Sequence, residues 1–168
     1  GAILFVLIKM FAPISGAHFN PAVSLVFYIR KELEQKDFPI YVLAQVVGGL
    51  IGVFLTHYIF NIQILQVSQN VRGEIPLLVS EIIATTGLLL TILFIRKSDS
   101  ASVALGVALF ISAGYWFTSS TSFANPAVTI ARVFTDTFTG IALVSVKFFI
   151  LGQIIGCLLA NYIFNLFD

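Results

Sequence analysis

Two long segments of the chain contain no Asp, Glu, Lys or Arg: one lies between Asp37 and Arg72, and the other between Asp99 and Arg132. Each can hold an apolar helix of about 20 residues, the length that crosses a bilayer. The whole chain has 58% hydrophobic and only 10% charged residues, which excludes an ordinary soluble domain. The sequence therefore predicts an all-α integral membrane protein that contacts the lipid bilayer. Its net charge of +1 argues against a nucleic-acid partner, which would favour a strongly basic patch.

Apolar helices are expected at residues 1–14, 38–60, 76–95, 101–118 and 142–165. Between them, the loops 28–37 and 95–100 carry five Lys and Arg residues. Cytoplasmic loops of membrane proteins are enriched in these basic residues. We therefore expect both loops to be cytoplasmic.

The chain contains an internal repeat. The tetrapeptide NPAV occurs at 20–23 and again at 125–128, and "AQVVGGLIG" at 44–52 is matched by "GQIIGCLLA" at 152–160. Because an odd number of expected spans separates the two NPA segments, the second copy is predicted to be inverted in the bilayer relative to the first. One membrane domain is expected, with a first repeat over 1–62, an extracellular connecting loop over 63–75 and a second repeat over 76–168.

Each NPA motif starts an apolar stretch too short to cross the membrane, 20–28 in the first half and 125–134 in the second. Asn is a preferred N-cap and Pro is favoured at the first helical position, so each motif is expected to begin a half-helix. Irregular backbone at membrane depth must be buried by protein or face a water-filled cavity. We expect the half-helices to meet at the midplane, with the amide N–H donors of both Asn caps free to face one pore. The predicted pore motif consists of Asn20, Pro21, Ala22, Asn125, Pro126 and Ala127.

These motifs resemble those of the aquaporin and aquaglyceroporin channels, the major intrinsic protein family. The similarity is carried by "SGAHFNPAV" at 15–23, "NPAV" at 125–128 and "SEIIATT" at 80–86. The resemblance implies an aquaporin-like inverted repeat of six spans, a homotetramer, no cofactor, and passage of water and small neutral solutes. This chain has only five expected spans. Its first span is therefore expected to be missing and its first repeat to be shortened at the N-terminus.

The resemblance also indicates the narrowest ring of the pore, which it places at Ala113, Ser122 and Val128. Most family members carry Arg where Val128 stands, so we expect a wider ring with no charge of its own. The segment "NPAVTIARVFTDTF" resembles a bacterial branch associated with arsenic resistance. That likeness implies a bacterial inner membrane and passage of trivalent metalloid hydroxides. A water and glycerol facilitator with no metalloid role is the alternative.

Two charged residues near the second motif have more than one interpretation. Glu81 lies inside a span, where an ionisable residue is costly, and the resemblance implies that it supports the second NPA loop rather than contacting solute. Arg132 lies one helical turn after Val128 and can reach back toward the ring as a mouth charge. The favoured alternative is an ion pair between Arg132 and Asp136.

Other residues are expected to line the pore or to pack. Those expected to line the pore, through backbone carbonyls and the His side chain, are Gly16, Ala17, His18, Thr121, Ser122 and Phe123. His57 is expected at the membrane interface, and Cys157 occupies a small packing position of the repeat.

Two other classes of function are weighed against a channel. An enzyme would need a nucleophile with a base or a metal cluster, and Glu81, His18 and single Ser or Thr residues form no such set, so no catalytic or metal-binding residue is expected. A secondary transporter with broken helices shares the inverted repeat. It would usually need a coupling-ion site, and Glu81 is the one carboxylate expected deep in a span.

Overall fold

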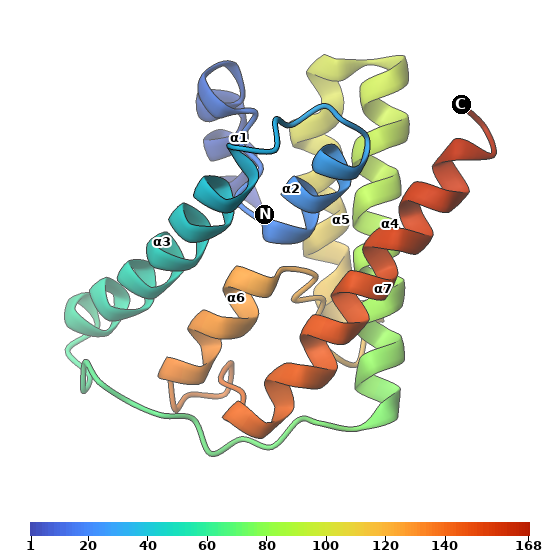
Figure 1. Ribbon diagram of the computed structural model, residues 1–168. Helices are drawn as coiled ribbons and strands as arrows, with labels where there is room; N and C mark the ends of the chain where they lie inside the picture. The colour runs from blue at the N-terminus through green and yellow to red at the C-terminus, as the bar shows by residue number, and fades with distance from the viewer.

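The computed structural model describes all residues from Gly1 to Asp168 and contains helices but no strand. The α-helices are α1 (Ala2–Ser15), α2 (Pro21–Ile29), α3 (Phe38–Ile59), α4 (Ile75–Ser98), α5 (Val103–Phe117), α6 (Pro126–Ala131) and α7 (Val146–Asn165). Three 3-10 turns adjoin them: η1 (Ser100–Ser102), η2 (Arg132–Phe134) and η3 (Leu143–Ser145). Figure 1 shows the short helices α2 and α6 set between the long ones.

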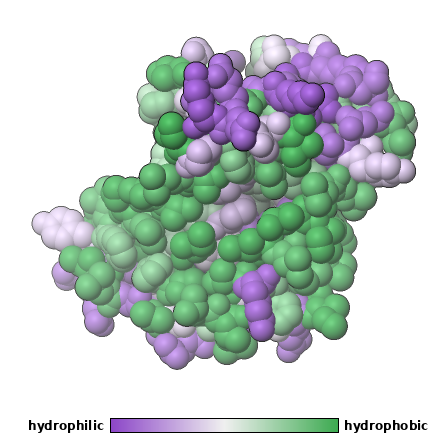
Figure 2. Space-filling model, in the orientation of Figure 1, coloured by the Kyte–Doolittle hydropathy of each residue, from purple (hydrophilic) through white to green (hydrophobic).

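Four of the long helical segments are long and apolar enough to cross a membrane: α3, α4, α5 with η1, and α7 with η3. The helix α1 is apolar but shorter. All five predicted helices are therefore confirmed to within a few residues, and four of them have the length and apolar composition of a membrane span. Figure 2 shows the result as a broad apolar band between two polar ends.

The loops 28–37 and 95–100, both predicted to be cytoplasmic, lie at the same end of the molecule, and the connection between α3 and α4 lies at the opposite end (Figure 1). Ion pairs join three segments at the first end. Asp168 accepts from Lys97 Nζ (2.9 Å) and Arg30 Nη2 (3.0 Å), and Arg96 pairs with Glu32. The hydrogen bonds from Lys97 and Arg30 hold the pKa of Asp168 below its usual value. Exposed pairs contribute little individually, but these tie the C-terminus to the end of α4.

Both half-helices begin as the sequence predicts. Asn20 Oδ1 accepts from Ala22 N (2.8 Å), and Asn125 Oδ1 accepts from Ala127 N (3.0 Å) and Val128 N (3.3 Å). A proline follows each cap, where its missing N–H costs nothing. The side-chain oxygen of each Asn is thus committed to its own helix.

Glycines let α4 and α7 approach closely along their length. A Cβ on Gly152 would lie 2.7 Å from Leu78 O, and one on Gly156 would lie 2.8 Å from Ile82 O. Because these neighbours are backbone atoms, only glycine fits at this separation. The corresponding face of α3 differs, since a Cβ on Gly48 or Gly52 would meet nothing within 4 Å.

The α4 helix positions the second NPA loop through Glu81, whose side chain is fully buried. Its Oε1 accepts from Ser120 Oγ (2.6 Å) and Phe123 N (2.9 Å), and its Oε2 accepts from Ala124 N (2.8 Å) and Gln153 Nε2 (2.6 Å). A carboxylate has acceptors only, so it matches four convergent donors. Glu81 thereby holds the loop backbone against α4 and α7.

We expect Gly156→Leu to lower the free energy of unfolding by about 1–3 kcal/mol, because the new side chain must push α4 and α7 apart. Denaturant or thermal unfolding in detergent measures the change. Leu158→Ala is the matched control, since Leu158 is an exposed residue of the same helix. Equal stability of the two variants would contradict the close helix contact.

We expect Glu81→Gln to lower stability by about 2–4 kcal/mol, because one oxygen becomes an NH2 group facing two donors. Unfolding in detergent measures the loss, and solute flux in vesicles should fall with it as the loop moves. Glu74→Gln is the control, since Glu74 is exposed and makes no side-chain cap hydrogen bond. A Glu81→Gln variant as stable as Glu74→Gln would show that Glu81 does not hold the loop.

Candidate functional site: a cavity at the two NPA motifs

The two half-helices meet at their N-termini through a pair of reciprocal hydrogen bonds. Asn20 Nδ2 donates to Ala124 O (2.7 Å), and Asn125 Nδ2 donates to Phe19 O (3.0 Å). Each Asn therefore reaches across to the residue that precedes the other Asn. The expectation that both amide hydrogens of each Asn are free for a pore needs correction. One hydrogen of each NH2 group closes the contact, and one remains.

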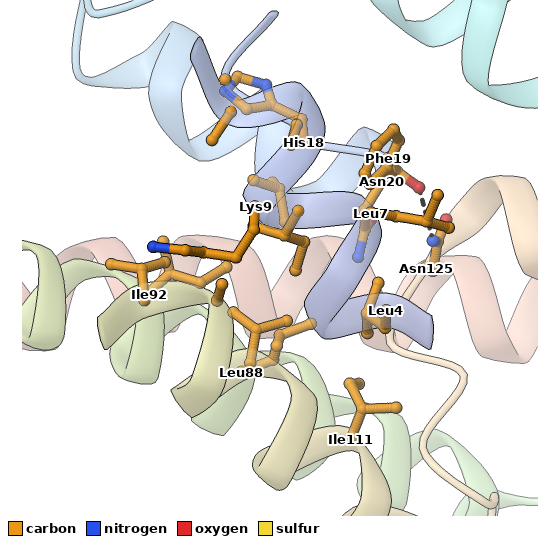
Figure 3. A pocket seen from close by; sticks show the side chains of 18 of the residues that line it. Leu4, Leu7, Lys9, His18, Phe19, Asn20, Leu88, Ile92, Ile111 and Asn125 are labelled. Atoms are coloured by element: carbon orange, nitrogen blue, oxygen red, sulfur yellow. Dashed lines mark hydrogen bonds between the residues drawn. The ribbon is translucent and has the colours of Figure 1, made fainter. Parts of the chain in front are cut away.

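A cavity of about 610 Å³ runs past this contact. Both Asn side chains lie on it among apolar side chains of α1, α4 and α5, including Leu4, Leu88 and Ile111 (Figure 3). Arg96 and Ser100 line it toward one end of the molecule, and Tyr115 and Arg132 line it beyond the second NPA motif. The cavity thus follows the long direction of the bundle rather than ending at the midplane.

The two loops before the caps share an unusual backbone. In the first, φ is +72° at Gly16, +50° at Ala17 and +50° at Phe19. In the second, φ is positive at the corresponding residues Thr121, Ser122 and Ala124. Non-glycine residues in this region cost about 1–3 kcal/mol each, so the surrounding bonds must hold them. The same strained path occurs twice, and Gly16, Ala17, His18, Ser122 and Phe123 of these loops line the cavity. Thr121 does not.

The three residues predicted for the ring are placed differently. Ser122 and Val128 line the cavity just beyond the second Asn. Ala113 is exposed and is not among the lining residues. From the same helix, Ile111 and Tyr115 line the cavity instead.

The ion pair between Arg132 and Asp136, which was the favoured interpretation, is wrong. Arg132 takes part in none of the ion pairs and instead donates to Thr139 O (3.2 Å). Asp136 accepts from Gln69 N (3.0 Å) of the connecting loop. Arg132 is turned toward the cavity because the loop after η2 folds back and presents a carbonyl, not a carboxylate, at its guanidinium.

His18 lies on the cavity between the half-helix α2 and helix α3. Its Nδ1 is 3.0 Å from Ser24 Oγ, and its ring stacks on Phe27. Gln45 Nε2 donates to the same hydroxyl (2.9 Å). In the second half, Gln153 Nε2 donates in the same way to Thr129 Oγ1 (2.8 Å). A Gln of a long helix thus fixes a hydroxyl one turn into each half-helix.

His57 and Cys157 are both buried. His57 lies in the last turn of α3, and its ring nitrogens contact Ile64 O (2.8 Å) and Thr135 Oγ1 (3.0 Å). It ties the connecting loop to the turn after η2. Cys157 is buried in the helix packing, as its place in the repeat predicts. No group of three or more His, Cys, Asp or Glu residues is arranged to hold a metal.

Sequence reasoning missed several cavity residues. The side chain of Lys9 extends along the cavity toward Ile92 (Figure 3). Arg96 and Tyr115 also line the cavity. The sequence does not fix how each helix is rotated, and that rotation decides which of its residues border the cavity.

A second cavity of about 560 Å³ lies on the other side of His18 and Phe19, against α3. Gln45, Gly48 and Val128 are among the residues that line it. Val128 therefore lies between the two cavities.

Comparison with known proteins agrees with this geometry. Residues 1–101 match the family described as Major intrinsic protein. The chain is 46% identical to Aquaglyceroporin AqpS of Rhizobium meliloti over 160 residues, which cover 95% of this chain and 69% of that protein. It is 28% identical to a probable NIP-type aquaporin of Nicotiana alata, over 99% of this chain and 63% of that protein.

The chain is also 35% identical to a glycerol uptake facilitator protein of Buchnera aphidicola over 63 residues, which cover 36% of this chain and 24% of that protein. The chain thus spans about two thirds of the length of the relatives that it matches throughout. The paired NPA half-helices, the cavity beside them and these similarities lead to one conclusion: the chain belongs to the major intrinsic protein family of membrane channels.

Proposed function

We propose that this protein is a passive channel for water and for a larger neutral hydroxylated solute, such as glycerol or a trivalent metalloid hydroxide. The observation that carries the proposal is the cavity that runs past Asn20 and Asn125 with Ser122 and Val128 at its side. Neither Ser122 nor Val128 adds a charge or a long side chain at that level. Two of the similar proteins are named for glycerol passage or as aquaglyceroporins, which supports the same class of solute.

The lining of the cavity suits a solute with hydroxyl groups on one side and carbon or a semimetal on the other. The remaining amide hydrogens of Asn20 and Asn125 can donate to a solute oxygen, and the strained loops offer carbonyls as acceptors. Leu4, Leu88 and Ile111 form an apolar surface around them. A few convergent polar groups on an apolar wall orient a small neutral molecule without holding it tightly.

Exclusion of cations and protons would follow from the same contact. Two half-helix N-termini point at one place, and each carries about half a positive charge. A water at that place receives donors from both sides, which interrupts a chain of waters along which protons could hop. A water bound to both Asn side chains would accept a hydrogen bond from each of them and would not pass a proton to the next water.

The proposal includes the membrane in which the protein lies, its orientation there and its oligomeric state. The loops 28–37 and 95–100 lie at the polar end that is rich in Arg and Lys, which supports a cytoplasmic location of that end. A rhizobial relative supports a bacterial inner membrane. A homotetramer with one pore per subunit is proposed from the family resemblance alone.

A secondary transporter is the alternative, because broken helices and inverted repeats are also used for coupled transport. Glu81, the carboxylate buried in a span, is already occupied by four donors from the loop and α7. It therefore has no acceptor left for a coupling ion. Solute flux through a channel should rise linearly with concentration and depend weakly on temperature, whereas a transporter should saturate.

We expect Val128→Arg in the complete protein to reduce glycerol and arsenous acid flux by about tenfold or more, because a long cation would cross the cavity beside Ser122. Water flux should fall less, since water needs less width. Stopped-flow vesicle shrinkage with each solute measures all three. Val128→Ala is the matched control and should leave all three near wild type. Unchanged glycerol and arsenous acid flux in Val128→Arg would contradict the assignment of Val128 to the narrow region.

A further inference from the structure

Arg132 presents an uncompensated positive charge to the cavity. It lies in η2, directly after the half-helix α6, and it lines the cavity together with Tyr115 and Phe123. Its Cζ atom is 5.3 Å from the centre of the Phe123 ring.

The hydrogen bonds of Arg132 leave most of its donors unused. A guanidinium has five N–H groups, and in this side chain Nη1 donates one hydrogen bond, to Thr139 O at 3.2 Å. No carboxylate pairs with it. The charge is therefore not neutralised locally, and its free donors are available to whatever occupies the cavity.

Arg72, a second arginine near the Phe123 side chain, has a structural role. The Cζ atom of Arg72 is 5.5 Å from the Phe123 ring centre, but its Nη2 is held by Ser120 O (3.0 Å), Ser119 O (3.4 Å) and Thr121 Oγ1 (3.5 Å). Arg72 is not among the cavity residues. It locks the connecting loop onto the NPA loop, and its charge adds to the positive potential at Arg132.

We propose that Arg132 is a specificity-determining residue that repels cations at the outer mouth, in place of a charge at position 128. The inference rests on the proposed channel function. Because Val128 and Arg132 are one helical turn apart, the width of the ring and the charge barrier are set by different residues. A charge set back in the mouth repels cations through space, while the ring beside Val128 stays open to a bulky neutral solute.

The test uses the complete protein in vesicles with three variants. Arg132→Gln removes the charge, Arg132→Lys keeps it, and Lys147→Gln removes an equal charge from an exposed residue at the same end that does not line the cavity. Alkali-cation and proton leak under an imposed membrane potential is the main measurement. Glycerol and water flux in the same vesicles report that the channel is folded and conducting.

We expect cation leak to rise by about tenfold or more in Arg132→Gln, because one unit charge is removed from a confined site of lowered dielectric. Arg132→Lys and Lys147→Gln should stay near wild type, and all three variants should still conduct glycerol without saturation. An unchanged leak in a glycerol-conducting Arg132→Gln channel would overturn the proposal. Equal leak in Arg132→Gln and Lys147→Gln would do so as well, because the effect would then be one of net charge. Saturable or absent glycerol flux in the wild type would instead reject the channel itself.

Discussion

The reciprocal bonds between the two Asn caps are the contact on which the site depends. Asn20 and Asn125 each use the side-chain oxygen to start a half-helix and one amide hydrogen to reach the opposite loop. The contact fixes the two helix N-termini against each other in the apolar interior, where unpaired backbone groups would be costly. It also leaves one amide hydrogen on each Asn, and those two hydrogens are what the cavity presents to a solute.

The strained loops before the caps persist because other parts of the molecule hold them. Glu81 accepts from two backbone N–H groups of the second loop, the Ser120 hydroxyl and the Gln153 amide, so a residue of α4 sets the position of the motif. Arg72 closes the same loop from outside through the Ser119 and Ser120 carbonyls. The positive φ values of these loops turn their carbonyls out of the helix pattern, and in the channel that we propose these carbonyls would be acceptors for the solute.

Selectivity in this arrangement has separate physical origins. In the channel that we propose, the level of Ser122 and Val128 would set the width, and the paired helix N-termini would orient a solute at the midplane. The Arg132 guanidinium, which also lines the cavity, would set the electrostatic barrier at the mouth. Size exclusion requires contact, whereas charge acts over several ångströms. A channel can therefore admit a bulky neutral molecule and still repel ions if the charge is moved away from the narrowest point.

The sequence by itself determined the helices, because charge-free apolar stretches and Asn-Pro caps are local signals with strong physical causes. It also determined that two half-helices exist and, because an odd number of spans separates them, that they point in opposite directions.

Tertiary structure decided which residues meet. Ala113 does not line the cavity, Lys9 lies along it, and His57 is buried in the protein, since each of these depends on how its helix is rotated. The contacts of Arg132 depend on how the loop after η2 folds. Asp136 is close to Arg132 in sequence, but Asp136 accepts from the connecting loop, and Arg132 faces the cavity. A spacing of three or four residues predicts contact between two side chains only within a regular helix, and here the helix ends between them.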